Sequence, residues 1–463
     1  MKSITSYKST IACLLLLTFS SCFLNNEQEK QKQEPATPAA KPTPHPEWIN
    51  QSNVYEVNVR QYSREGTFKA FETALPRLKE MGVEILWFMP VTPISKIDRK
   101  GTLGSYYAVQ DYKAVNPEFG TLDDFKAVVN KAHDMGFKVV IDWVANHTGA
   151  DHPWLTSHPD FYNHDSTGKV IYAFDWSDTR DLNYDNKAMR DSMIASMKYW
   201  LQETNIDGFR CDVANEVPAN FWKACIDSLR IIKSIFMLAE GNKPELHEAG
   251  FDASYAWTQF HAMVEVAAGK HDVIYLDSLL QAERNKFPAG SSFLYFTSNH
   301  DENSWNKADY GTFPGLKHAA FAVLTQTMQN SLPLIYSGQE EPVLRAISFF
   351  EKDSMAFKNY KRAKFYHTLL NLRKTTPALA MDASFTKVSV GNDKALYAYT
   401  RQKDHHKILV ILNLSPKPQT ITIKDSSLTG NPLNVFMGMK EPLAINHSFN
   451  IEQWGYIIYD YDR

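Results

Sequence analysis

Cysteine is scarce in this sequence. Only four of the 463 residues are cysteines, and they are Cys13, Cys22, Cys211 and Cys225. This number excludes a scaffold held together by disulfides, and the spacing contains none of the paired cysteines typical of zinc sites. Two of the four lie within the first 22 residues. Cys211 should point away from its neighbours Arg210 and Asp212, so we expect it to be a packing residue and not a nucleophile.

An excess of charge of one sign is also lacking. The chain has 49 Lys and Arg against 52 Asp and Glu, a formal net charge of -3. Nucleic-acid binding relies on surplus cations that neutralise phosphates, so no nucleic-acid partner is expected. The length and the 44% hydrophobic content fit one large globular domain plus a small one.

The N-terminus contains an apolar run that is too short to span a membrane. Lys2 and Lys8 precede the run from Ile11 to Phe19, and Cys22 follows it. The pattern indicates an export signal over residues 1–22 and resembles a bacterial lipoprotein signal with Cys22 lipidated, although Phe19 replaces the usual Leu. Plain cleavage and an uncleaved apolar start are the alternatives. We expect an exported, membrane-anchored lipoprotein of a Gram-negative envelope, on the periplasmic or cell-surface face.

Residues 23–46 are rich in Glu, Gln, Lys, Pro and Ala and predict a disordered linker. From Trp48 onward, short apolar runs alternate with amphipathic stretches, which favours a closed (β/α)8 TIM barrel over residues 47–382. The expected strands are Val54 to Val59, Val83 to Met89, Lys138 to Trp143, Gly208 to Val213, Phe236 to Glu240, Ser254 to Thr258, Phe293 to Ser298 and Leu332 to Tyr336. The expected helices include Phe68 to Met81, Leu122 to Met135, Met189 to Glu203 and Phe221 to Lys233.

Two further regions depart from the barrel pattern. Residues 148–185 contain many His, Pro, Asp and aromatic residues without helical periodicity, which indicates a subdomain inserted after the third strand, over the barrel mouth. Residues 383–463 show short alternating runs, which predict a C-terminal antiparallel β-sandwich. Its expected strands include Ala395 to Arg401, Lys407 to Asn413, Gln419 to Ile423 and Tyr456 to Tyr461.

Charged residues gather where the predicted barrel strands end, at the face where catalytic groups collect in this fold. Asp212, Glu240 and Asp301 end the fourth, fifth and seventh strands. Taken singly, Asp301 could cap a loop and His147, after the third strand, could be a core imidazole. Burying three acids together is unfavourable unless cations or function hold them.

Arg210 lies two residues before Asp212, so both side chains face the same side of their strand. The guanidinium would keep Asp212 ionised, and the crowded negative charge would raise the proton affinity of a neighbouring acid. Two carboxyl groups with opposite protonation states are what cleavage of a glycosidic bond requires.

The stretches that carry these residues resemble the four short signatures of the α-amylase superfamily, glycoside hydrolase family 13, in their usual order. They are residues 142–147, 208–212, 238–240 and 298–302, and residues 103–112, 181–184 and 334–340 add to the resemblance. Any one stretch is a weak signal, whereas the ordered set is highly specific.

The resemblance implies a role for each matching residue. Asp212 would be the nucleophile and Glu240 the general acid and base. Asp301 would be the third carboxylate and would hold sugar hydroxyls. His147 and His300 would hydrogen-bond the same sugar, Arg210 would pair with the nucleophile, and Tyr107 would stack beneath the ring.

One departure concerns calcium. Many calcium-dependent α-amylases carry a Lys-His pair shortly after the nucleophile, but Asn215 and Glu216 stand at those positions. Calcium is therefore possible but not supported by the usual ligand pattern, and the metal ligands stay unknown. The chemistry itself requires no cofactor.

The expected activity is retaining hydrolysis of α-1,4-glucosidic bonds in starch-like α-glucans or maltooligosaccharides. The stretch from Asp212 to Val217 is closer to the corresponding stretch of cyclomaltodextrinases and neopullulanases, so these activities are alternatives. The activities of α-1,6-acting and transglycosylating relatives are alternatives as well. A non-enzymatic surface glycan-binding protein is the alternative from another class.

Overall fold

The structure is a computed structural model and describes residues 46–462. The predicted signal peptide with its lipidation site Cys22, and the predicted linker up to residue 45, lie outside the described residues. Within residues 46–462, no helix has both the length and the apolar character needed to cross a membrane.

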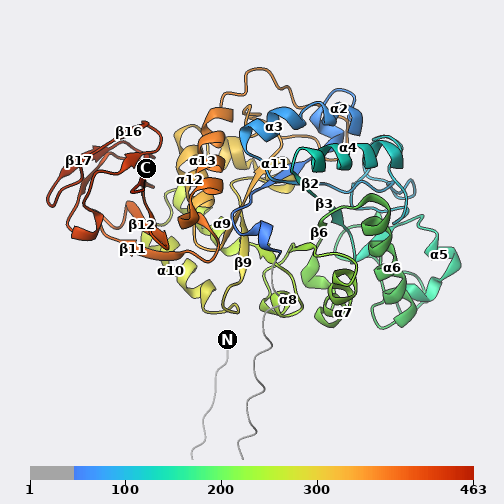
Figure 1. Ribbon diagram of the computed structural model, residues 1–463. Helices are drawn as coiled ribbons and strands as arrows, with labels where there is room; N and C mark the ends of the chain where they lie inside the picture. Colours follow the sequence, from blue (N-terminus) through green and yellow to red (C-terminus); the bar gives the residue numbers. More distant parts are fainter. Residues whose placement is uncertain (1–45, 463) are drawn as a thin grey trace, which may run out of the picture. The chain divides into compact units, whose positions relative to one another are not determined.

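Eight parallel strands close into a barrel in the order β1-β10-β9-β8-β7-β6-β3-β2, with helices around them (Figure 1). The strands are β1 (Val54–Val57), β2 (Ile85–Phe88), β3 (Lys138–Trp143), β6 (Gly208–Cys211), β7 (Phe236–Ala239), β8 (Ala253–Tyr255), β9 (Ser292–Tyr295) and β10 (Ser331–Tyr336). Every strand predicted for the barrel is present, so the expected (β/α)8 fold is confirmed.

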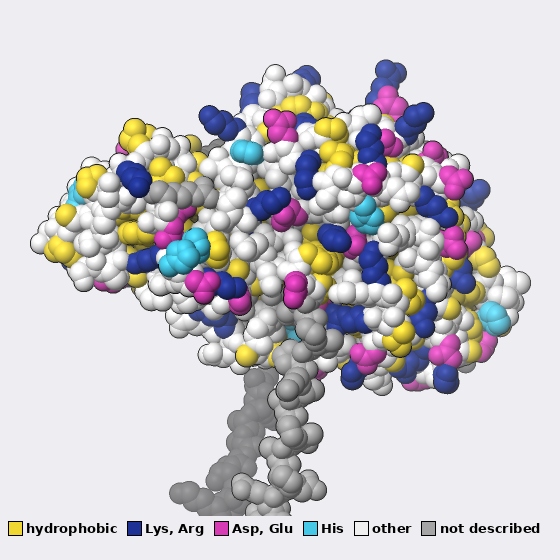
Figure 2. All heavy atoms as spheres, viewed as in Figure 1, with side chains coloured by type: hydrophobic (Ala, Val, Ile, Leu, Met, Phe, Trp, Pro, Cys, Tyr) yellow, Lys and Arg dark blue, Asp and Glu magenta, His cyan; other side chains and the backbone are white. Residues whose placement is uncertain are grey.

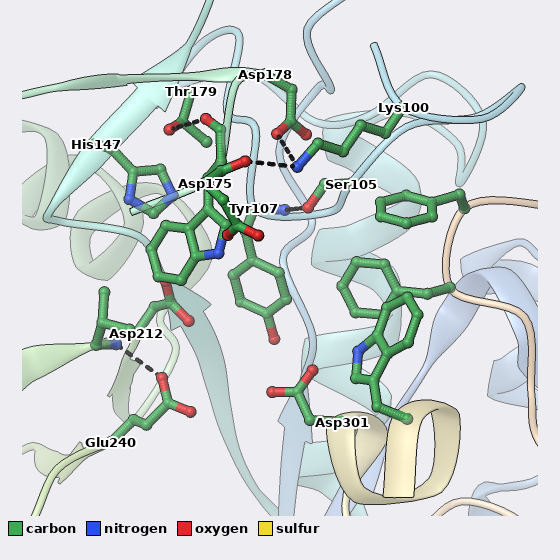
Figure 3. A pocket seen from close by; sticks show the side chains of 15 residues that line it. Lys100, Ser105, Tyr107, His147, Asp175, Asp178, Thr179, Asp212, Glu240 and Asp301 are labelled. Carbon is green, nitrogen blue, oxygen red and sulfur yellow. Dashed lines mark hydrogen bonds and ion pairs between the residues drawn. The ribbon is translucent and has the colours of Figure 1, made fainter. Parts of the chain in front are cut away.

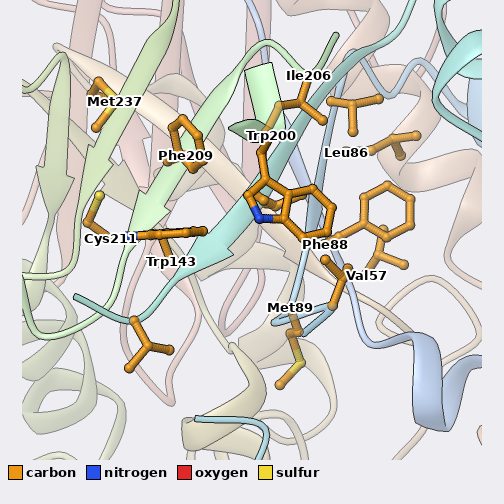
Figure 4. Close-up of a cluster of buried hydrophobic side chains, with 14 of the residues drawn as sticks. Val57, Leu86, Phe88, Met89, Trp143, Trp200, Ile206, Phe209, Cys211 and Met237 are labelled. Carbon is orange, nitrogen blue, oxygen red and sulfur yellow. The ribbon is translucent and has the colours of Figure 1, made fainter. Parts of the chain in front are cut away.

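Alternate residues of each strand face the two sides of the barrel wall. Phe209 and Cys211 of β6 point outward and pack in an apolar layer with Trp143 and with Trp200 of the surrounding helix α6 (Lys187–Thr204) (Figure 4). Arg210, between them in the sequence, points the other way and is fully buried. The same strand therefore supplies both the apolar core and the polar interior.

The helices begin at side-chain caps that the sequence provides. Thr121 and Asp124 form a capping box at the start of α4, and Asn186 accepts a hydrogen bond from Met189 N at the start of α6. The helices are α1 (Val59–Tyr62), α2 (Phe68–Glu72), α3 (Leu75–Met81), α4 (Leu122–Asp134), α5 (Trp154–Ser157), α6 (Lys187–Thr204), α7 (Ala219–Arg230), α8 (Pro244–Glu248), α9 (Trp257–Ala267), α10 (Val273–Arg284), α11 (His300–Asn306), α12 (Leu316–Thr327) and α13 (Ala363–Thr375).

Several predicted elements have other bounds in the structure. The helix predicted over Phe68 to Met81 is divided into α2 and α3, because Pro76 lacks an N–H and fits only the first turn of a new helix. The sixth strand, predicted to reach Thr258, ends at Tyr255, and Trp257 already begins α9.

The segment inserted after β3 forms a small unit of its own. It contains the antiparallel pair β4 (His147–Gly149) and β5 (Thr179–Asp181), the short helix α5, and a buried group that includes Phe161, Tyr162 and Leu182. Asp175, Trp176 and Asp178 of the segment line the cavity described below. The predicted inserted subdomain is therefore present beside the barrel mouth.

The C-terminal region is antiparallel, as predicted. A six-stranded sheet has the order β11 (Ser384–Val388), β12 (Leu396–Lys403), β13 (His406–Asn413), β18 (Tyr456–Asp460), β15 (Leu433–Asn434) and β16 (Met439–Lys440). The pair β14 (Gln419–Thr422) and β17 (Ser448–Ile451) packs against it through Ile421 and Ile451. Arg401 of β12 donates to the carbonyl oxygens of Thr327 and Met328, which join this region to the barrel.

The surface carries both signs of charge. On the face shown in Figure 2, Lys and Arg side chains alternate with Asp and Glu side chains. This mixture agrees with the formal net charge of -3.

Candidate active site

A cavity of about 470 Å³ lies at the carboxyl end of the barrel strands, between the barrel, the inserted segment and the loop after β10 (Figure 3). Five of the residues predicted for the site line it: Tyr107, His147, Asp212, Glu240 and Asp301. The other two, Arg210 and His300, lie directly behind this lining, in contact with it. The fold therefore brings all seven predicted residues together.

Arg210 is the centre of the buried charge. Its Nη1 donates to Asp142 Oδ1 at 2.8 Å and to Asp212 Oδ1 at 2.9 Å, and its Nη2 lies 2.9 Å from Glu240 Oε1. Its Nε donates to the Tyr255 hydroxyl at 3.1 Å. One guanidinium thus fixes the positions of three carboxylates, two of which are the predicted nucleophile and acid.

Asp212 and Glu240 have opposite pKa shifts. Burial raises the pKa of Asp212 well above its usual value, and the charges of Glu240 and Asp142 add to this rise against Arg210. Burial acts in the same direction on Glu240, but Arg210 and the N–H of Val213, which donates at 2.8 Å, lower its pKa overall. The two acids therefore interact strongly through one guanidinium, and they titrate as a pair rather than as separate groups.

His300 is held in a cationic form. Its Nδ1 lies 2.5 Å from Glu56 Oε1, and its Nε2 lies 2.8 Å from the Tyr107 hydroxyl and 3.4 Å from Asp301 Oδ2. Burial alone would lower its pKa, but Asp301 and Glu56 raise it to about 9. His300 therefore carries a positive charge at neutral pH and links the acid of β1 to the cavity wall.

His147 behaves in the opposite way. Burial lowers its pKa to about 4, so its imidazole is neutral at neutral pH. The Asn146 amide lies 3.2 Å from His147 Nδ1. If the amide nitrogen donates there, Nε2 carries the proton and can donate to a hydroxyl group.

Aromatic rings form another part of the wall. The ring of Tyr107 stacks on His300 at 5.5 Å and on Phe349 at 6.3 Å between centroids. Trp305, Phe349 and Phe350 line the side near Asp301, and Trp305 is 54% exposed. Flat apolar faces beside a few polar groups suit a ligand that has both C–H faces and hydroxyls.

Lys100 ties the inserted segment to the loop after β2. Its ammonium lies 3.2 Å from Asp178 Oδ1 and donates to the carbonyl oxygen of Asp175 at 3.4 Å. Both residues line the cavity, so this ion pair fixes one part of its wall.

Two buried acids of the site were not among the predicted site residues, although Asp142 lies in one of the strand-end stretches noted in the sequence. Asp142 accepts hydrogen bonds from Arg210, from the Tyr107 hydroxyl at 3.1 Å and from Trp87 Nε1 at 3.3 Å. Glu56 pairs with His300 and is fully buried. Both could have been selected from the sequence. Each is the single acid of a largely apolar strand, and such an acid is expected to face the polar interior of the barrel.

Asn215, at the position of the Lys of the Lys-His pair, already has hydrogen-bond partners. The Asn215 carbonyl oxygen accepts a hydrogen bond from the Lys243 ammonium at 2.8 Å, and its side-chain oxygen accepts one from Asn242 N at 3.2 Å. A lysine ammonium on this carbonyl makes Asn215 itself an unsuitable calcium ligand. Across residues 46–462, no group of three or more His, Cys, Asp or Glu side chains is arranged to hold a metal ion.

The fold and the site together define a class: a (β/α)8-barrel protein with paired carboxylic acids at the catalytic face. The family model for the α-amylase catalytic domain matches residues 45–167 and 160–249. This match, the fold and the similarity to known α-amylases support membership of the α-amylase superfamily, glycoside hydrolase family 13.

Known proteins show the range of this similarity. The chain is 28% identical to α-amylase MalA of Haloarcula japonica over 403 residues, which is 83% of this chain but only 58% of MalA. It is 25% identical to a cyclomaltodextrinase from a Bacillus species over 73% of this chain and 64% of that enzyme. A solved α-amylase structure from Lactobacillus plantarum has 28% identity and a TM-score of 0.80, with 89% of this chain and 99% of that chain covered.

Proposed function

We propose that the protein is a retaining glycoside hydrolase that cleaves α-1,4-glucosidic bonds in starch-like α-glucans or maltooligosaccharides. The observation that carries this proposal is the attachment of Asp212 and Glu240 to one guanidinium, with Asp301 lining the same cavity. Asp212 Oδ1 and Glu240 Oε1 each lie 2.9 Å from a terminal nitrogen of the same guanidinium, so the two carboxyl groups are close together. This proximity supports direct attack by one of them, since an inverting site needs room for a water between its acids.

In the first step, an Asp212 carboxylate oxygen attacks the anomeric carbon as the bond to the glycosidic oxygen breaks. Glu240 gives its proton to that oxygen, which departs as the free hydroxyl of the leaving glucan. The product is an ester between Asp212 and the glycosyl unit. In the second step, Glu240 takes a proton from water, the water oxygen attacks the same carbon, and Asp212 leaves as a carboxylate.

This cycle needs the proton on Glu240 at the start, whereas the geometry described above favours Asp212. The two acids act as one pair that shares a proton. When the shared proton lies on Glu240, this carboxyl can donate it to the glycosidic oxygen. Arg210 then stabilises Asp212 as the anion that attacks.

The remaining residues stabilise the oxocarbenium-like transition state. Asp301 and the neutral His147 bind sugar hydroxyls and hold the ring in a distorted shape. Tyr107, fixed by Asp142 and His300, offers an electron-rich surface to the developing positive charge.

Product analysis of the purified full-length protein in detergent tests this proposal. Incubation with amylose, pullulan and cyclodextrin, followed by proton NMR of the first products, should show α-anomers released from amylose. Initial β-anomers would contradict the double displacement. Glucan binding without any release of reducing sugar would instead favour a non-enzymatic glycan-binding protein.

A second candidate function is that of a cyclomaltodextrinase, because one matching relative carries this activity in its name. The same assay separates the two, since a cyclomaltodextrinase should open cyclodextrin faster than it cleaves amylose. Preferential cleavage of pullulan would point to an α-1,6-acting or neopullulanase-like relative.

We also propose that the enzyme is exported and held at a membrane through a lipid on Cys22. The apolar run before Cys22 and the charged residues Lys2 and Lys8 support this proposal. Cys22→Ala should move the protein from the membrane fraction to the soluble fraction. Unchanged partitioning would contradict lipidation.

A further inference from the structure

Glu56 is a buried acid that the reaction described above does not use. It lies in β1, where it is paired with Trp87 of β2 and Tyr336 of β10, and it is fully buried. Ser337 N donates to the Glu56 carbonyl oxygen at 3.1 Å, and the Ser337 hydroxyl donates to the same oxygen. The backbone of Glu56 is therefore held on both sides within the barrel wall.

Fold stability does not explain an acid at this position. Burial raises the pKa of Glu56, because the charged form is unfavourable away from water. Its Oε1 lies 2.5 Å from His300 Nδ1, whereas its Oε2 has no hydrogen-bond partner within residues 46–462. A buried acid with one partnered oxygen is unfavourable for folding, which points to a role in the reaction.

The hydrogen bonds of Glu56 continue through His300 to the aromatic wall. A carboxylate only accepts hydrogen bonds, so His300 Nδ1 carries a proton. The Tyr107 hydroxyl has one proton, which it donates to Asp142 Oδ2 at 3.1 Å, and it lies 2.8 Å from His300 Nε2. With its own proton on Asp142, this hydroxyl accepts the proton of Nε2. Both ring nitrogens of His300 therefore donate.

His300 and Tyr107 adjoin the place where the bond is cleaved. Tyr107 lines the active-site cavity, and its ring stacks on His300 at 5.5 Å between centroids with an interplanar angle of 23°. His300 Nε2 also lies 3.4 Å from Asp301 Oδ2. A neutral group in place of the Glu56 carboxylate would no longer require a proton on Nδ1, and the direction of every later hydrogen bond would be free to reverse.

We propose that Glu56 is a positioning residue of the hydrolysis: its carboxylate keeps both ring nitrogens of His300 as donors and thereby orients His300 and the Tyr107 hydroxyl toward the sugar. The proposal rests on the proposed function, because it requires a sugar ring beside His300 and Tyr107. Glu56 itself touches no substrate. Since it acts through the imidazole, its effect on the rate exists only while His300 is present.

Two substitutions separate the charge of Glu56 from its volume. Glu56→Gln keeps the size and removes the charge, whereas Glu56→Asp keeps the charge and removes one methylene. On maltoheptaose, Glu56→Gln should lower kcat about 10-fold with little change in KM, because the misalignment is felt in the transition state. Glu56→Asp should retain more of the kcat than Glu56→Gln. A packing role predicts the opposite order, since only Asp leaves a gap.

A double-mutant cycle tests whether Glu56 acts through His300. In the His300→Ala background, Glu56→Gln should change kcat by less than about 2-fold. Glu340→Gln is the matched control, because Glu340 is also a fully buried glutamate but is held by Tyr55 and Arg77. It should change kcat by the same factor in both backgrounds.

The outcomes are distinguishable. Equal losses from Glu56→Gln in the wild-type and His300→Ala backgrounds would overturn this inference, as would a Glu56→Asp variant that is less active than Glu56→Gln. Should Glu56→Gln fail to fold, the same cycle with Glu56→Asp decides, and its loss should likewise disappear without His300. Cleavage of maltoheptaose by the wild type upholds the proposed function in each case. A wild type that does not cleave it would overturn the function and this inference with it.

Discussion

The two ends of strand β6 carry opposite balances of charge. Before the strand, Asp207 is one buried carboxylate among three basic side chains, with His133 at 2.7 Å, Lys233 at 3.0 Å and Lys138 at 3.3 Å. At its other end, Arg210 is one buried guanidinium among three carboxylates.

The pKa shifts follow this difference. Burial opposes ionisation of Asp207, but His133, the N–H of Val139 and Lys233 lower its pKa to about 2. For Asp212, burial and the neighbouring acids raise the pKa. The surplus of basic groups before the strand thus keeps Asp207 ionised. The surplus of acids after the strand favours a protonated carboxyl group there.

This contrast separates stability from chemistry within one strand. A fully paired carboxylate with a low pKa stabilises the fold and has no proton to give. A crowded group of acids is unfavourable for folding and is retained where proton transfer requires it. In this fold the carboxyl ends of the strands carry catalysis and the amino ends carry stability.

The largest effect is expected from removing one acid of the pair. Asp212→Asn and Glu240→Gln should each lower kcat on maltooligosaccharides about 10³-fold or more, because each removes a group that acts in the transition state. Thermal denaturation should show both variants as stable as the wild type, since each removes one acid from a crowded group. Near-normal hydrolysis by either purified variant would contradict the assignment of the site.

Asp207→Asn, at the other end of the strand, should lower the stability and leave the activity intact. Its lowered pKa gives a contribution of about 2 kcal/mol to the free energy of unfolding, present above pH 4 and lost as the pH falls through about 2. Chemical denaturation at pH 7 should therefore show a loss of about 2 kcal/mol in the variant. The activity of the folded variant should persist, because Asp207 and Asp212 are about 16 Å apart along the strand.

Measuring the same variant at low pH sharpens this test. The wild type should lose stability between about pH 4 and pH 2 more steeply than Asp207→Asn, which lacks the titrating group. Equal slopes would mean that the surplus of basic residues does not stabilise Asp207.

The smallest effect concerns Asp142, a positioning residue that touches Arg210 and Tyr107. Its negative charge helps to raise the pKa of Asp212. Asp142→Asn should therefore move the acidic limb of the kcat/KM profile to lower pH, with a loss of about 10-fold in the rate at the optimum. A merely structural role would lower the rate without moving this limb, and Asp207→Asn is the control in which the profile should stay in place.

Much of this architecture could be predicted from the sequence. The eight barrel strands have short apolar runs with polar residues at their ends, so their positions and the acids that follow them are local properties. Asp212, Glu240 and Asp301 could be selected because strand ends of a parallel barrel meet on one face. The division of the predicted first helix was less accessible, since it depended on how strongly Pro76 outweighs an amphipathic pattern.

Other parts depended on contacts between distant segments. The pairing of Glu56 with His300 joins residues 244 positions apart, and the contact of Tyr107 with His300 joins residues 193 positions apart. The hydrogen bond from Val213 N to Glu240 Oε2, which helps to lower the pKa of Glu240, was not visible in the sequence either.

The sequence by itself determined the alternation of strands and helices and the identity of the acids, because these depend on neighbouring residues and on the fixed periodicity of a strand. Only the tertiary structure decided which acid has the stronger partners and which residues hold His300. Those properties depend on distances between side chains of different strands, and a pKa changes with each such distance.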